Sequence, residues 1–336
     1  ALLPARGSAD LSGTRADQRR RTEELLGTAI ASLMTPIKPV VVLAHGEPRR
    51  FMSDVPLLSK MVERLSFRGI DTVEWAAAIE PDPPSLLAID PAGSRPMVIV
   101  ALSPDSSAAA SKNDLSGAQR AGAMAASLTN QLDAGRNLLL SLNPSVLPGY
   151  GEPDPLAGLL ARFGVAADTG RPLLTEAVTP AGRFVDTDRT AMADDSNHPI
   201  ANAAKGLTTM LPWPIPLTER PVPANVRVQY SPLYSIVTGP AVWAESQWLK
   251  VWQTPRDQRL GMTEPPAFDA GRDLRTPTGK EISNPTPERW VVAAAAERFE
   301  VGRDSQRLVV VGSNSWFIDR VARRAVEVDG RPVPAH

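Results

Sequence analysis

Short apolar runs that alternate with amphipathic stretches constrain the fold of this chain more than any other feature. In the first half the runs lie over residues 39–44, 97–102 and 137–142, and each is closed by a turn that contains Gly or Pro. A similar run at 307–312 brings the pattern back near the end of the chain. Strands that are apolar on both faces and separated by helices are typical of a covered parallel sheet. The sequence therefore predicts an α/β fold with a parallel-rich open sheet.

Helices are expected between these strands, because capping residues and apolar periodicity occur there. Asp54 is a candidate cap for a helix that ends at Gly69, and an Ala-rich helix is expected over 115–134. Asp154 followed by Pro155 is a favoured helix start, with Asp as the cap and Pro in the first turn. The remaining elements expected in the α/β parts are a strand over 70–75 and a helix over 316–325.

The character of the chain changes between its two α/β parts. Residues 172–290 contain sixteen of the 33 prolines. Short strand-like runs at 183–186, 226–230 and 290–295 are separated there by Pro-rich turns, which favours an inserted mixed α+β region with long loops at 254–288. The expected organisation is an N-terminal helical segment (1–37), the first part of the α/β domain (38–168), the inserted Pro-rich region (169–300), and a return to the sheet with a tail (301–336).

Composition excludes several classes of function. The 36 basic and 37 acidic residues leave a net charge of −1, which argues against a nucleic-acid-binding surface. Cysteine is absent, so disulfides, thiolate zinc sites and a Cys nucleophile are excluded. There is no Gly-rich phosphate-binding loop and no dinucleotide-binding fingerprint. We therefore expect no cofactor, no metal and no ATP binding.

The turn after the first strand holds the candidate functional residues. His45, Gly46 and Glu47 follow that strand at its carboxyl end, and Ser103 and Asn143 close two other strands. Ligands of open α/β sheets bind at this edge, near the point where the strand order reverses. These five residues are therefore a candidate site for a polar ligand or a partner loop, with Gly46 allowing close approach of the backbone. The alternative is a polar turn whose side chains cap neighbouring groups.

An acidic loop with one histidine, residues 194–198, is a second polar feature of the inserted region. Cation binding is one interpretation of this loop. The favoured interpretation is a loop that ends in a cap before a short helix.

Taken in order, the motifs of this chain resemble the GldG-like family, the auxiliary domains of ABC-type transport systems of the gliding-motility type. The resemblance covers roughly residues 38–320. The motifs that carry it are His45-Gly46-Glu47-Pro48, the helix and strand at 54–75, the strand ending at Pro104, Gly135–Pro144, Asp154–Val165, His198-Pro199-Ile200 and Val309–Phe317. One departure is the turn Gly312-Ser-Asn-Ser-Trp316, which lacks the two carboxylates of the family pattern.

The resemblance implies a non-catalytic, extracytoplasmic accessory or ligand-sensing domain. It would work beside an ABC permease and a separate ATPase subunit, anchored by membrane segments outside this chain. The implied fold is flavodoxin-like or class I glutamine amidotransferase-like, and the Cys nucleophile of such amidotransferases has no counterpart here. Two alternatives remain: a hydrolase that uses His45 and Glu47, and a purely structural protein-interaction module.

Overall fold

The computed structural model describes residues 37–48, 52, 58–111, 114–206, 208–237, 242–255, 258–259, 289–300, 305–316, 325–328 and 331–334. Several expectations lie outside these residues. They are almost all of the N-terminal helical segment, the candidate cap Asp54, most of the 254–288 loop, and the helix expected after Trp316.

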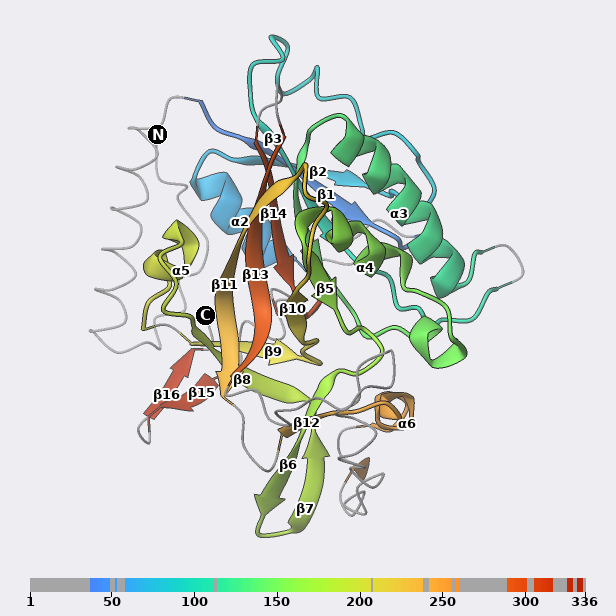
Figure 1. The fold of residues 1–336 in the computed structure, drawn as a ribbon, viewed down its shortest axis with the longest axis vertical. Coiled ribbons are helices and arrows are strands. Elements are labelled where there is room, and N and C mark those ends of the chain that lie inside the picture. The colour runs from blue at the N-terminus through green and yellow to red at the C-terminus, as the bar shows by residue number, and fades with distance from the viewer. Residues whose placement is uncertain are drawn as a thin grey trace, which may run out of the picture.

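A nine-stranded mixed sheet forms the centre of the molecule, in the order β2-β1-β3-β4-β14-β13-β11-β8-β9 (Figure 1). We call its first five strands the parallel half and its last four the antiparallel half. The parallel half consists of β2 (Asp71–Trp75), β1 (Val40–His45), β3 (Met97–Leu102), β4 (Asn137–Ser141) and β14 (Gln306–Val311). The antiparallel half consists of β13 (Arg289–Phe299), β11 (Arg227–Val237), β8 (Asp188–Ala193) and β9 (Thr208–Pro212).

The strand β14 joins the end of the chain to the sheet of its first half. It pairs in parallel with β4 and antiparallel with β13. The α/β class is therefore confirmed, as is the expectation that the apolar runs at both ends of the chain belong to one parallel-rich sheet.

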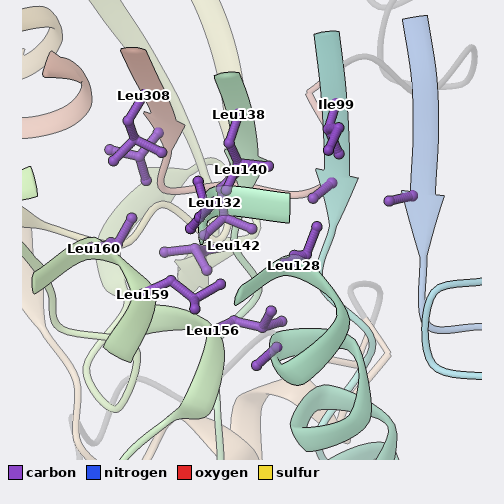
Figure 2. Packing of buried hydrophobic residues seen from close by; sticks show 14 of the residues in the cluster. Ile99, Leu128, Leu132, Leu138, Leu140, Leu142, Leu156, Leu159, Leu160 and Leu308 are labelled. Carbon is purple, nitrogen blue, oxygen red and sulfur yellow. The ribbon is translucent and has the colours of Figure 1, made fainter. Parts of the chain in front are cut away.

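Helices cover both faces of the parallel half because its strands are apolar on both sides. On one face lie α3 (Gly117–Asp133), α4 (Pro155–Leu159) and a 3₁₀ turn (Leu160–Phe163). Figure 2 shows their leucines packed against Leu138 and Leu140 of β4. On the other face, α2 (Ser59–Phe67) begins next to Leu58, which packs against Leu43 and Leu102. All six residues of β1 are consequently buried.

Capping residues set the starts of α3 and α4, and the sequence predicts the cap of α4 at Asp154. The Ser116 hydroxyl accepts a hydrogen bond from the Gln119 backbone N–H, and the Gln119 side chain accepts one from the Ser116 N–H. Asp154 Oδ1 accepts hydrogen bonds from the next two free N–H groups of α4, each at 2.9 Å. Gly135, with a φ of 78°, follows the end of α3.

The Pro-rich region extends the same sheet with four antiparallel strands. The strand signals expected at 226–230 and 290–295 correspond to β11 and β13, which are longer than expected at 11 residues each. β11 is longer than expected because it continues through Pro232, a residue that in the sequence indicates the end of a strand. In the structure Pro232 lies within the strand, next to a register shift and away from the two residues, Tyr234 and Ser235, that pair with β8. A proline without a ladder N–H is tolerated at such a place.

The other elements attach to this sheet as small additions. A three-stranded sheet of β12 (Val242–Ala244), β6 (Leu173–Thr179) and β7 (Gly182–Asp186) projects at one end of the molecule near α6 (Trp248–Trp252) (Figure 1). The remaining elements are a 3₁₀ turn (Leu147–Tyr150), α5 (Pro199–Ala203), the pair β5 (Val165–Ala167) and β10 (Leu217–Glu219), and the pair β15 (Ala325–Val328) and β16 (Arg331–Pro334). None of the helices in the described ranges is long and apolar enough to cross a membrane.

Candidate functional site

The carboxyl ends of β1 and β3 meet at a topological switch point. The chain runs from β1 to β2 on one side and then returns to β3 on the other side of β1. In open α/β sheets this is the place where ligands bind. Gly46 and Pro104 touch here: a Cβ atom on Gly46 would lie 2.9 Å from Pro104 Cγ. The close approach that Gly46 permits is thus to Pro104, and the turns expected to lie together do so.

His45 lies inside this edge rather than on its surface. It is 1% exposed, and its Nε2 lies 3.0 Å from Glu74 Oε1 on the neighbouring strand β2. Its Nδ1 accepts the backbone N–H of Glu47 at 3.2 Å, so Nε2 carries the proton that Glu74 accepts. Burial lowers the pKa of His45, and the nearby carboxylates of Glu74 and Glu47 oppose that shift. Both ring nitrogens are therefore engaged, as the capping alternative requires.

Ser103 and Asn143 hold neighbouring strand ends together. The Asn143 backbone N–H donates to Ser103 Oγ at 2.6 Å, and its side-chain Nδ2 donates to the Ser103 carbonyl at 3.3 Å. Asn314, from the turn after β14, donates to the same carbonyl at 2.8 Å. Ser103 itself is buried. The turns after β3, β4 and β14 are thereby joined into one hydrogen-bonded unit.

Glu47 is the partly exposed side chain of this edge, and it lies near the buried side chain of Arg120. Arg120 is in the first turns of α3, and one of its terminal nitrogens lies 3.6 Å from Glu47 Oε2. The Glu47 side chain is 30% exposed and that of Arg120 is 9% exposed. The other terminal nitrogen donates to the Leu115 carbonyl at 3.3 Å. Arg120 Nε is buried without a hydrogen-bond partner among the described residues.

Two side chains of this edge, Glu74 and Arg120, were not predicted from the sequence, and Asn314 was a turn residue that either capping or catalysis would explain. Arg120 carried a usable signal, because it is the only charged residue between positions 117 and 132. Glu74 had a weaker one, as a carboxylate within a short strand. Asn314 had none, since capping explains an Asn in a turn equally well.

A Pro-rich segment that contains Pro212 and Ile215 covers the turn after β14. Ile215 donates its backbone N–H to the Gly312 carbonyl at 2.6 Å, and Ser313 Oγ donates to the Pro212 carbonyl at 2.6 Å. A Cβ on Gly312 would lie 2.2 Å from the Ile215 oxygen. This segment therefore covers the end of β14.

The acidic loop at 194–198 serves as the start of α5. His198 Nδ1 accepts the Ile200 backbone N–H at 3.2 Å and caps the helix, which confirms the favoured interpretation. Asp194 accepts a hydrogen bond from the Ser235 hydroxyl at 2.7 Å, and Asp195 lies 3.8 Å from Lys205 Nζ. In the part of the chain that the structure describes, no group of three or more His, Asp or Glu side chains could hold a metal ion.

Comparison with known proteins adds no relative: no protein-family model matches the chain, and no curated protein matches it at a significant level. The functional interpretation therefore depends on the motifs of the sequence and on the geometry of this edge.

Proposed function

We propose that this chain is a non-catalytic accessory domain of an ABC-type membrane transport complex. It docks a partner loop or a polar ligand at the carboxyl edge of β1 and β3. The observation that carries the proposal is the state of this edge: its buried polar groups, His45 and Ser103 among them, hold the strand-end turns together. What remains at the surface is the partly exposed carboxylate of Glu47, a polar rim that lies 3.6 Å from a buried terminal nitrogen of Arg120.

The same hydrogen bonds argue against the hydrolase alternative. A general base needs a free nitrogen within reach of the proton that it removes. His45 Nδ1 is occupied by the Glu47 N–H and Nε2 faces Glu74. The Ser103 hydroxyl accepts the Asn143 backbone N–H at 2.6 Å, so it is part of the link between two strand ends. A docking role requires none of these groups to be free.

The strand order supports a finer assignment of the fold. Counting β14 as the fifth strand, the parallel half runs 2-1-3-4-5, which is the order of flavodoxin-like sheets. We place the parallel half with flavodoxin-like and class I glutamine amidotransferase-like folds, with the antiparallel half as an addition. Within the proposal the domain is extracytoplasmic, and membrane segments outside this chain anchor it beside the permease.

The proposal expects genes for an ABC permease and its ATPase beside the gene of this chain, and the test is co-purification with these subunits. The full-length protein is expressed with these subunits, extracted in detergent and separated by size-exclusion chromatography. Co-elution with the permease is expected. Glu47→Trp places a bulky ring on the rim and is expected to lower the co-eluting fraction by about tenfold, a change of roughly 1.4 kcal/mol.

Asp133→Trp is the matched control. Asp133 pairs with Arg162 at the end of α3 that is far from Arg120, so it is an exposed carboxylate at the opposite edge of the sheet. This variant is expected to co-elute like the wild type. A wild-type protein that elutes alone would contradict the proposal, and so would a Glu47→Trp variant that folds and co-elutes normally.

A further inference from the structure

The guanidinium of Arg120 is buried with fewer partners than it can bind. An arginine has five N–H donors in a planar fork that matches a carboxylate. Here one terminal nitrogen donates to the Leu115 carbonyl, and Nε has no partner among the described residues. Arg120 as a whole is 7% exposed, so water cannot freely replace the missing acceptors. A buried charged group in this state carries a desolvation cost that a well-placed anion would offset.

Glu47 supplies a negative charge near Arg120, but the two side chains do not form a close ion pair. The 3.6 Å between its Oε2 and the Arg120 nitrogen is longer than a charge-assisted hydrogen bond of 2.7–2.9 Å. Glu47 is partly exposed and belongs to the turn after β1, whereas Arg120 is fixed in the capped first turns of α3. The glutamate is thus the member of the pair that an incoming group can displace.

We propose that Arg120 is the anchor of a carboxylate-binding site at the switch point, which Glu47 occupies while no ligand is bound. An incoming carboxylate would displace the Glu47 side chain and accept hydrogen bonds from Nε and a terminal nitrogen of Arg120. A carboxylate is favoured over phosphate because the site already matches the single charge of Glu47. The carboxylate comes from a small acid or from a polypeptide. This inference rests on the proposed docking role of the same edge and specifies the chemical group that binds there.

The experiment follows the side-chain Nε–Hε signal of Arg120 by NMR in the purified chain, with Arg120→Lys to assign it. Acetate and a short peptide with a free carboxyl terminus are the two probes, and the amide of the same peptide is the negative probe. Both carboxylates are expected to shift the signal saturably, and the amide is expected to leave it unchanged. Tighter binding of the peptide than of acetate identifies a polypeptide as the source, and equal binding a small acid.

Glu47→Gln removes the internal competitor without changing its shape. If the site is occupied by Glu47 most of the time, the apparent affinity for acetate rises by about tenfold in this variant. Asp133→Asn, at the opposite end of α3, is the control and is expected to bind acetate like the wild type. Glu47→Gln also keeps the test valid if Arg120→Lys fails to fold.

Three results would overturn the inference. They are no gain in acetate affinity in Glu47→Gln, an equal shift with inorganic phosphate, and acetate binding that calorimetry finds unchanged in a folded Arg120→Lys variant. Its failure can be distinguished from that of the proposed function. Loss of co-elution in Glu47→Trp without carboxylate binding contradicts the inference alone. Carboxylate binding with normal co-elution of Glu47→Trp contradicts the docking role alone.

Discussion

Strand β1 of the parallel half and strands β8 and β11 of the antiparallel half bury their residues differently. In the parallel half, β1 is buried at every position because helices cover both of its faces. In the antiparallel half, β8 and β11 mix buried with exposed positions, and Met192 of β8 is 54% exposed. The difference follows from topology, since parallel strands need crossover connections that place helices on the sheet, whereas antiparallel strands do not.

The halves also differ in where their turns lie. All parallel strands end at one edge, so the turns after β1, β3, β4 and β14 gather their polar side chains in one place. Antiparallel strands end alternately at both edges, which scatters their turns. The comparison explains why the candidate site lies on the parallel half, although the Pro-rich region holds most of the tryptophans.

The largest expected effect on the free energy of unfolding comes from truncating a buried leucine in the parallel half. Leu140 of β4 is fully buried between the sheet and the helices, so Leu140→Ala should cost about 2–5 kcal/mol of unfolding free energy. Met192→Ala, on the exposed side of β8, should change it by less than about 0.5 kcal/mol. Urea denaturation measures both. Equal costs would mean that Leu140 of β4 and Met192 of β8 are buried alike, which would contradict the comparison of the two strands.

A second pair of variants tests the junction between the halves. Gly312→Ala would place a methyl group 2.2 Å from the Ile215 carbonyl oxygen, which is backbone and cannot rotate away. A loss of about 1–3 kcal/mol is expected. Gly122→Ala in α3 meets nothing within 4 Å and should instead stabilise by about 0.5–1 kcal/mol. Thermal unfolding should move in opposite directions, and a stabilised Gly312→Ala variant would disprove the tight crossing at this turn.

The pH dependence of stability should reflect the buried histidine of the parallel half. Burial lowers the pKa of His45 below its ordinary 6.5, so the unfolded chain takes up its proton first. The contribution of His45 is therefore complete above about pH 6.5 and is lost as the pH falls from there toward its folded pKa. Denaturation between about pH 7.5 and 5 should show a smaller loss of stability in His45→Gln than in the wild type.

Glu297, a carboxylate of the antiparallel half, should not contribute to the loss of stability over this pH range. A hydrogen bond from the Ser305 hydroxyl, opposed by burial and aided by Arg307, lowers the pKa of Glu297 from 4.5, so its contribution is lost only at more acidic pH. Identical slopes in His45→Gln and the wild type would show that His45 does not govern this window.

The smallest expected effect is that of MgATP, which should not bind to this chain. The turns after β1 and β3 occupy the places where α/β nucleotide-binding proteins carry Gly-rich phosphate loops, and here they contain His45-Gly46-Glu47 and Ser103-Pro104. Calorimetry with MgATP should give no binding heat. Micromolar binding would mean that the parallel half recognises phosphate through another element.

Much of the parallel half could be predicted from the sequence, because its signals are local. Apolar runs gave the positions of β1, β3, β4 and β14, and Ser116 and Asp154 lie where α3 and α4 begin. The length of β11 could not be predicted in this way. Whether Pro232 ends a strand depends on whether a neighbouring strand needs its N–H, and that is a tertiary fact.

The candidate site, too, could be predicted only in part from the sequence. That His45, Glu47, Ser103 and Asn143 lie at strand ends follows from the sequence alone, because each is within three residues of the end of an apolar run. Their roles depend on contacts between segments that are far apart in the chain. Glu74 comes from β2 and makes His45 a buried support, and Arg120 comes from α3 and meets Glu47. Chain position sets which residues are near a turn, but burial and hydrogen-bond partners arise between segments far apart in sequence, and these decide which side chains stay available at the surface.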